Sequence, residues 1–280
     1  MPPFRLVDAF AEQAFAGNPA GVVLLERPQP VAWMQAVATE VNASETAFLV
    51  RSEPDGDTWR LRWFTPTTEV DLCGHATLAA AHVLWQDARA PADATLRFAT
   101  RSGVLTATAE DRVIWLDLPA WPVRTHPEPS RLASALGAAA GRYVGRSAGN
   151  VDPSGASQDD QAQANDVVVL DHERAVHELA PDLAEVARLG SGGLIVTAPS
   201  DGDDDFVSRY FAPALGVPED PVTGSAHATL GPWWAQELGR DTLTARQLSR
   251  RGGHLRVRVV DDRVHVGGAA VTVISGALAD

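Results

Sequence analysis

Apolar positions follow two different spacings along the chain, and together these predict a mixture of helices and strands. In residues 31–41, Val31, Met34, Val37, Ala38 and Val41 recur at helical spacing and form one face. Elsewhere the apolar residues form short runs bounded by turn residues, which is typical of strands. The predicted strands are 4–10, 21–25, 46–50, 59–65, 95–100, 104–109, 113–118, 167–170, 194–198, 207–211, 255–260, 263–267 and 271–275. We therefore expect an α+β fold in which most strands are antiparallel.

Two further segments predict helices of a different kind. Residues 75–85 are rich in alanine and leucine and nearly lack charge, and a second apolar helix is expected near 225–238. A helix that is apolar on all sides must be buried along its whole circumference. A further helix is expected at 180–189.

The two halves of the chain repeat one another. Residues 62–78 contain RWFTP followed by EVDLCGHATL, and residues 209–230 contain RYFAP followed by EDPVTGSAHATL. Each copy reads as a strand, a proline-containing loop, a glycine and an apolar helix. A duplicated order of elements predicts two pseudosymmetric domains, with a ligand expected in the cleft between them.

We place the N-terminal repeat domain at 1–120 and the C-terminal one at 121–280, and we allow for the last strand to pack on the first domain. The proline-rich stretch 119–129 is the best linker candidate. The polar stretch 149–165 is predicted to be a mobile surface loop.

Composition excludes several classes of protein. The chain has no lysine, so all 23 basic residues are arginine, which excludes Schiff-base enzymes and P-loop nucleotide binding. A net charge of −13 argues against nucleic acid as a partner. The single cysteine, Cys73, excludes an intrachain disulfide and a four-cysteine zinc site. No apolar run is long enough to span a membrane and residues 1–5 do not resemble a signal peptide, so we expect a cytoplasmic protein without a membrane partner.

Two glycines lie where a loop enters an apolar helix. The first turn of a helix offers unpaired N–H groups and the positive end of its dipole, and glycine lets an anion approach closely. Gly74 and Gly224, with the Ser225 hydroxyl, therefore predict a site for a small carboxylate that needs no lysine. The alternative is that both glycines only permit tight turns.

Four other residues carry candidate acid/base or binding chemistry. Glu45 opens a strand among small and apolar neighbours, where a carboxyl partly removed from water can act as both acid and base. His75 follows Gly74, and Asp220 precedes Gly224 by four residues, so we expect both beside the same ligand. Asn18, in the Gly-Asn-Pro-Ala turn, is a candidate substrate-binding residue. The alternatives are a solvated charge for Glu45, a helix cap for His75 and a turn residue for Asn18.

Cys73 directly precedes Gly74, and its counterpart in the repeat is Thr223. A two-base racemase needs a thiol on each face of its substrate, and one thiol with one hydroxyl does not make that pair. The histidines and Cys73 show no metal-binding spacing, so we predict no metal site.

Taken together, these motifs resemble the phenazine-biosynthesis PhzF-like isomerase family, which lies within the diaminopimelate epimerase-like fold superfamily. The resemblance covers nearly the whole chain. The matching segments are 8–10, 15–20, 44–48, 64–66, 72–77, 219–226 and 247–253.

The resemblance implies two domains, each a curved barrel-like sheet around a central helix. It implies that Glu45 moves a proton within a cyclic dihydro-hydroxyanthranilate-type substrate, with His75 and Asp220 positioning the substrate or handling protons. Gly74, Gly224 and Ser225 would hold the substrate carboxylate. It also implies that no cofactor is needed and that the protein is a homodimer.

Two alternatives stay open at this point. One is an amino-acid-type racemase or epimerase that uses Cys73 as a base. The other is a scaffold without catalytic activity that binds a small carboxylate or a protein partner.

Overall fold

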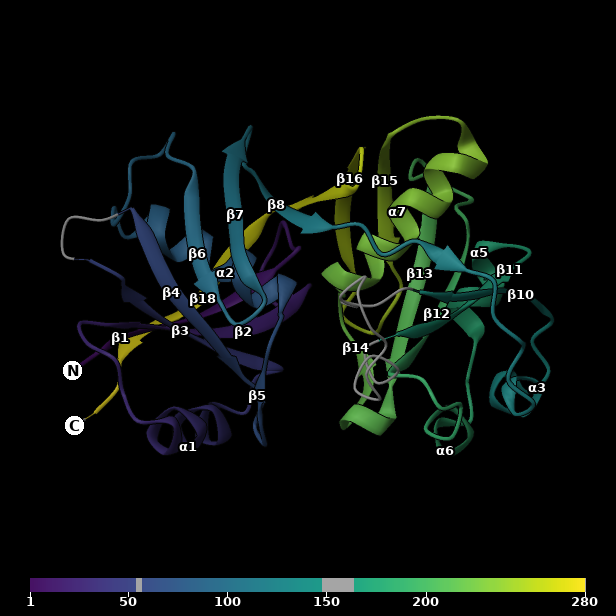
Figure 1. Cartoon of the computed structure of the whole chain (residues 1–280), viewed down its shortest axis with the longest axis horizontal. Helices are drawn as coiled ribbons and strands as arrows, with labels where there is room; N and C mark the ends of the chain where they lie inside the picture. The colour runs from purple at the N-terminus through teal and green to yellow at the C-terminus, as the bar shows by residue number, and fades with distance from the viewer. Residues whose placement is uncertain (54–56, 148–163, 280) are drawn as a thin grey trace. The chain divides into compact units, whose positions relative to one another are not determined.

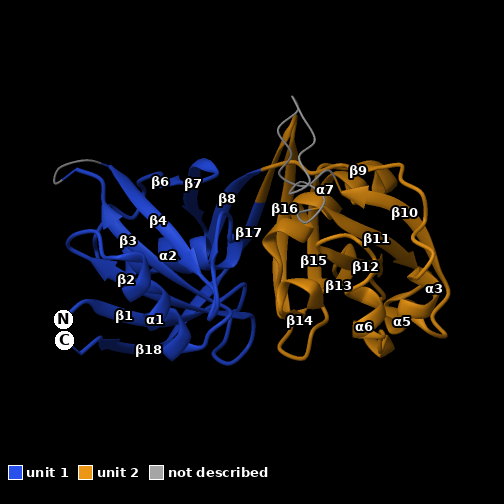
Figure 2. Cartoon of the chain, turned by 60° about the horizontal axis from the view of Figure 1, so that its bottom comes forward, with its two compact units in different colours: residues 1–118, 266–280 blue, residues 119–265 orange. Residues whose placement is uncertain are grey.

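The computed structural model describes residues 1–53, 57–147 and 164–279, and within them the chain forms two compact units. Unit 1 comprises Met1–Leu118 and Val266–Asp280, and unit 2 comprises Pro119–His265 (Figure 2). Unit 1 ends at residue 118, close to the predicted boundary after residue 120, and residues 266–280, which contain the last strand, also belong to unit 1. The predicted mobile loop 149–165 falls almost entirely outside the described residues.

Unit 1 is a sheet of mostly antiparallel strands with α2 (Gly74–Gln86) packed on it (Figure 1). The order of its strands is β18-β1-β2-β3-β4-β6-β7-β8, with β5 paired to β4. Two pairs, β2 with β3 and β4 with β6, are parallel. The strands are β1 (Pro3–Ala9), β2 (Asn18–Leu25), β3 (Glu45–Arg51), β4 (Thr58–Phe64), β5 (Glu69–Val70), β6 (Leu96–Thr100), β7 (Gly103–Glu110), β8 (Val113–Pro119) and β18 (Ala270–Ala277).

The α2 helix is buried on most of its sides, as its nearly uncharged sequence predicts. It contacts β1, β2, β3 and β18, and nine of its 13 residues are buried. The opposite face of the sheet is covered by α1 (Val31–Val41), where Met34 and Ala38 pack with Phe48 and Phe64. No helix among the described residues is both long enough and apolar enough to cross a membrane.

Unit 2 repeats this arrangement around α7 (Gly224–Leu238). Its strands run in the order β9-β10-β11-β12-β13-β15-β16, with β14 paired to β13, and the pairs β11 with β12 and β13 with β15 are parallel. These strands are β9 (Val123–Arg124), β10 (Gly141–Ser147), β11 (Asn165–Leu170), β12 (Gly193–Pro199), β13 (Phe206–Ala212), β14 (Val217–Asp220), β15 (Thr242–Gln247) and β16 (Gly253–Val260). β17 (Arg263–Gly268) then carries the chain back into unit 1.

The repeat extends from strand order to side-chain contacts. In unit 1 the Arg62 guanidinium donates two hydrogen bonds to Glu69, joining β4 to β5. In unit 2 Arg209 donates the same pair of bonds to Glu219, joining β13 to β14. The α+β fold with a sheet wrapped around a central helix in each unit is therefore confirmed.

Short elements of unit 2 differ from the sequence prediction. In place of the helix expected at 180–189, the structure has only the short helix α6 (Leu183–Val186), and a second short helix, α5 (Glu173–Glu178), precedes it. The sequence also gave no indication of α3 (Leu132–Leu136) or β10. A helix of five residues has too few intrahelical bonds to show a periodic pattern, and tertiary packing stabilises it instead.

Candidate active site

Three elements of unit 1 begin at the same end of the sheet and bring the predicted acid/base residues together. Asn18 opens β2 and Glu45 opens the parallel neighbour β3, with Ala20 paired to Glu45. Successive side chains of a strand point to opposite faces, so Glu45 shares a face with the fully buried Ala47 and Leu49. Phe48 lies on the other face, against α1. His75 lies in the first turn of α2, which packs on β2 and β3.

Glu45 and His75 form the central contact of the site. The Glu45 Oε2 atom lies 3.1 Å from His75 Nε2, with side-chain exposures of 15% and 6%. Outside this ion pair, neither atom has a hydrogen-bond partner among the described residues. A carboxyl that is mostly removed from water and held beside an imidazole can accept and return a proton.

The other nitrogen of the His75 ring also has partners. Asn18 Nδ2 lies 3.2 Å from His75 Nδ1, and the Asn18 side chain is fully buried. Ser44 Oγ donates a hydrogen bond of 2.9 Å to Asn18 Oδ1. The Cys73 sulfur lies 3.5 Å from the same Nδ1. The ring is therefore fixed from both sides.

The ionisation of Cys73 and His75 follows from these surroundings. Burial, and then the charge on Glu45, raise the pKa of Cys73 to about 11, so the thiol is uncharged at pH 7. Burial acts to lower the pKa of His75, but its interactions with Cys73 and Glu45 outweigh burial and place the pKa well above its usual value. Because the Cys73 thiol is neutral near pH 7, Glu45 is the negative group that favours a protonated ring there.

Glu45, Cys73 and His75 also form a group of metal-ligand residue types among the described residues. Ligand-type atoms of Glu45, Cys73 and His75 are all within 4.8 Å of one another. However, Cys73 contacts Nδ1 of the ring and Glu45 contacts Nε2. A histidine binds a metal ion through one ring nitrogen, so a single ion would not explain contacts to both nitrogens. Hydrogen bonds to the two ring nitrogens explain both contacts.

The start of α7 in unit 2 is built differently. Thr223 Oγ1 donates a short hydrogen bond to Asp220 Oδ2. Gln247, fully buried, accepts from the Thr223 backbone N–H at 2.9 Å and donates to the Asp220 carbonyl at 2.7 Å. These bonds fix the loop that carries Asp220 and leads into Gly224 and Ser225.

The repeat has a glycine, and not a second carboxylate, at the position that corresponds to Glu45. Thr46 pairs with Phe64 and Leu194 pairs with Phe211, so the repeat aligns Glu45 with Gly193. A Cβ atom on Gly193 would lie 2.7 Å from the Tyr210 hydroxyl and 2.8 Å from the Phe211 carbonyl oxygen. The Tyr210 hydroxyl, which donates to Asn165 Oδ1 at 2.9 Å, fills this space.

We expect Gly193→Ala to destabilise the protein by about 1–3 kcal/mol, because an added methyl group in a filled space forces its neighbours to move. Urea denaturation of the variant measures this cost. Gly202→Ala is the matched control, since its nearest neighbour would be a serine hydroxyl oxygen at 3.8 Å. Equal stability of the two variants would show that the space beside Tyr210 is not filled.

The predicted site residues divide between the two units, four in unit 1 and three in unit 2. The structure joins Glu45, His75 and Asn18 in one hydrogen-bonded group, and Gly74 begins α2 beside them. In unit 2, Asp220 lies just before Gly224 and Ser225, which begin α7. Sequence reasoning did not single out Ser44, Gln247 or Tyr210. Ser44 and Gln247 begin the matching segments 44–48 and 247–253, and Ser44 directly precedes Glu45, but these signals assigned neither residue a role.

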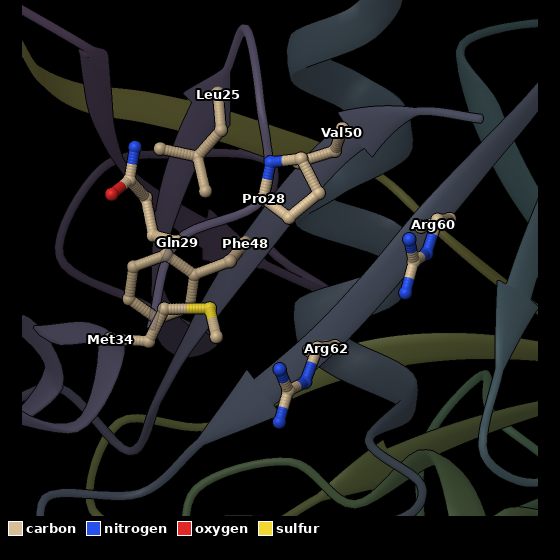
Figure 3. A pocket seen from close by; sticks show the side chains of 8 residues that line it. All are labelled: Leu25, Pro28, Gln29, Met34, Phe48, Val50, Arg60 and Arg62. Atoms are coloured by element: carbon tan, nitrogen blue, oxygen red, sulfur yellow. The ribbon is translucent and has the colours of Figure 1, made fainter. Parts of the chain in front are cut away.

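A separate small pocket lies on the α1 side of unit 1 (Figure 3). Its volume of about 40 Å³ has room for no more than a few water molecules. Phe48 and Val50 of β3 line it, so it opens on the opposite face of the strand from Glu45. The lining residues are Leu25, Pro28, Gln29, Met34, Phe48, Val50, Arg60 and Arg62.

Comparison with known proteins identifies the family. A family model described as phenazine biosynthesis-like protein, PhzC-PhzF, matches residues 7–276. The chain belongs to this family. Within the PhzC-PhzF family, it is 47% identical to an uncharacterized isomerase of Pseudomonas aeruginosa, covering 98% of this chain and 97% of that protein. It is also 44% identical to an uncharacterized isomerase of Halalkalibacterium halodurans, with 99% and 98% covered.

Solved structures, one of this family and one of a more distant protein, share the fold. A PhzF-family protein of Enterococcus faecalis is 40% identical, with a TM-score of 0.86 and 99% of both chains covered. A probable proline racemase of Agrobacterium radiobacter is 11% identical, with a TM-score of 0.62 and with 100% of this chain and 93% of the racemase chain covered. At this low identity, the likeness shows only that the two proteins share a fold. Because the chain belongs to the PhzC-PhzF family and the two relatives at 47% and 44% identity are isomerases, this protein is an isomerase.

Proposed function

We propose that this isomerase moves a proton within a small cyclic carboxylate of the dihydro-hydroxyanthranilate type, with Glu45 as the acid/base. The observation that carries the proposal is the Glu45–His75 contact of 3.1 Å, in which a carboxyl only 15% exposed is held at the first turn of α2. Many folds support several chemistries, so the reaction is argued from this site and not from the fold.

The proton balance of the proposed reaction is simple. The Glu45 carboxylate takes a proton from a substrate carbon, and the electron pair left behind spreads over the conjugated system. The Glu45 carboxylic acid then returns the proton to another carbon of the same system. No atom is gained or lost, and the proposed reaction needs no cofactor or metal ion.

His75 and the start of α2 supply the remaining roles that we propose in unit 1. His75 Nε2 holds the Glu45 carboxyl in one orientation. Because the carboxyl is already oriented, the proton transfer does not have to pay the entropy cost of ordering this side chain. The N–H groups near Gly74 bind the substrate carboxylate, since a helix N-terminus attracts an anion.

For unit 2, we propose that Gly224 and Ser225 bind the substrate carboxylate and that Asp220 positions the substrate or handles a proton. The short bond from Thr223 keeps the Asp220 carboxyl in one orientation.

The experiment that tests the proposed function is a metabolite screen in deuterated water. The protein is incubated with a pool of small cyclic acids and amino acids, and mass spectrometry finds the compound that isomerises or gains deuterium. We expect a conjugated cyclic carboxylate to react. Exchange only at the α-carbon of an amino acid would favour a racemase, and no reaction with any compound would favour a scaffold without catalytic activity.

The racemase alternative makes Cys73 the base, and the structure offers little support for that role. Its thiol is 6% exposed, and its pKa of about 11 keeps it protonated at pH 7. We expect Cys73→Ala to keep turnover close to that of the wild type on the compound found in the screen. A base normally supplies about 10²–10⁴-fold in rate, so a loss of that size in Cys73→Ala with intact folding would overturn the Glu45 assignment.

A further inference from the structure

Asn18 and Ser44 lie behind the histidine of the site and form a chain of polar contacts with it. Ser44 Oγ donates to Asn18 Oδ1 at 2.9 Å, and Asn18 Nδ2 lies 3.2 Å from His75 Nδ1. On the far side of the ring, His75 Nε2 lies 3.1 Å from Glu45. Because Asn18 is fully buried, its amide meets the ring and not the solvent.

This chain of contacts fixes the tautomer of the neutral ring. An amide nitrogen only donates, so when Asn18 Nδ2 faces Nδ1, that ring nitrogen must accept the hydrogen bond. The ring proton then sits on Nε2 and points to Glu45. The Cys73 sulfur, 3.5 Å from the same Nδ1, is the longer of the two contacts at that nitrogen.

The same two residues also suit the charged ring. When His75 gains a second proton, Nδ1 becomes a donor and needs an acceptor. Half a turn of the Asn18 carboxamide brings its oxygen to Nδ1 and its nitrogen to Ser44, whose hydroxyl accepts as readily as it donates. An amide oxygen and an amide nitrogen occupy nearly the same volume, so both orientations fit one space.

We propose that Asn18 and Ser44 are positioning residues that form an amide switch. The switch lets His75 gain and lose its Nδ1 proton beside Glu45 while Nδ1 keeps the Asn18 carboxamide as a hydrogen-bond partner in both states. The inference deepens the proposed function, because a ring that adapts its charge stabilises Glu45 both before and after the carboxylate takes a proton.

The protonation of the His75 ring depends on the charged and titratable groups of the elements that pack against α2. Among the described residues, Glu45 of β3 and Cys73 are the titratable side chains that contact His75. On β1, the buried Asp8 carboxyl accepts a hydrogen bond of 2.6 Å from the Phe15 backbone N–H, and Arg5 pairs with Asp87. On β18, Thr272 contacts His82, farther along α2. Asn18 is therefore the uncharged partner whose replacement most directly changes the proton on Nδ1.

The test is a pH titration of the full chain labelled with ¹⁵N at histidine, followed by NMR of the ring nitrogens. The His75 signals are those that disappear in His75→Gln. In the wild type we expect the ring to lose its Nδ1 proton as the pH rises, with a midpoint above 6.5, and to keep its Nε2 proton. A neutral wild-type ring protonated on Nδ1 would overturn the inference without any variant at position 18.

Two substitutions at position 18 sharpen the result. Asn18→Asp supplies only acceptors and a negative charge, so we expect the midpoint to rise by about one pH unit or more. Asn18→Leu has a similar size and no hydrogen bonds, and we expect a midpoint below that of the wild type. Equal midpoints in wild type and Asn18→Asp would contradict the switch, whereas loss of turnover in Glu45→Gln tests the proposed function separately.

Discussion

Glu45→Gln should lower turnover by about 10²–10⁴-fold, the usual contribution of a well-placed general acid/base. The amide has the same shape as the carboxyl and still accepts a hydrogen bond from His75 Nε2, but it does not take a proton from carbon. We expect the variant to fold, with a lower free energy of unfolding, because the amide keeps the hydrogen bond to His75 but no longer supplies the negative charge that favours a protonated ring. Steady-state rates and calorimetric binding of the compound found in the screen measure the effect on turnover, and urea denaturation measures the effect on stability.

The matched control for this variant is Glu40→Gln, which makes the same change at an exposed position of α1. It should leave the rate, the binding and the stability unchanged. If Glu45→Gln binds the compound normally and turns it over as fast as Glu40→Gln does, Glu45 is not the acid/base.

The largest effect on stability is expected for Asp166→Ala in unit 2. The Asp166 carboxyl is fully buried and accepts hydrogen bonds from Tyr143, Arg146 and Ser191. The Arg146 side chain is itself only 12% exposed. Removing one partner of a buried ion pair leaves an uncompensated charge and typically costs about 3–5 kcal/mol.

Urea denaturation followed by circular dichroism measures this loss. Asp166→Asn keeps some of the hydrogen bonds and should fall between the wild type and Asp166→Ala. The control is Glu178→Ala, which breaks an exposed pair with Arg174 whose side chains are 58% and 76% exposed. Exposed pairs of this kind contribute about 0.3–0.5 kcal/mol. An equal loss in Asp166→Ala and Glu178→Ala would contradict the buried network.

Local patterns were enough to predict the main elements of the fold. The α2 and α7 helices begin at Gly74 and Gly224, where the repeated loop-glycine-helix motif places them. β3 begins at Glu45, next to the strand predicted at 46–50. These features depend on residues close together in sequence, and the spacing of apolar residues within a short window is enough to predict them.

The parts that were not predicted depend on contacts between distant residues. The Asp166–Arg146 pair joins positions 20 residues apart, and Asn18 meets a histidine 57 residues away. The Tyr210 hydroxyl occupies the space beside Gly193, which appears in the sequence only as one glycine among several. In β10, glycines and arginines interrupt the apolar pattern, so its place in the sheet is decided by pairing with β9 and β11.

The most direct test of the central claim is the deuterium content of the product formed in deuterated water by wild type and by Glu45→Gln. A single carboxyl that takes a proton from one carbon and returns it to another carries part of the original hydrogen across. At early times, the wild type should therefore give product in which fewer than all molecules hold deuterium at the new C–H position, and Glu45→Gln should give almost no product. Product formed by Glu45→Gln at the wild-type rate, with the same isotope content, would contradict the account.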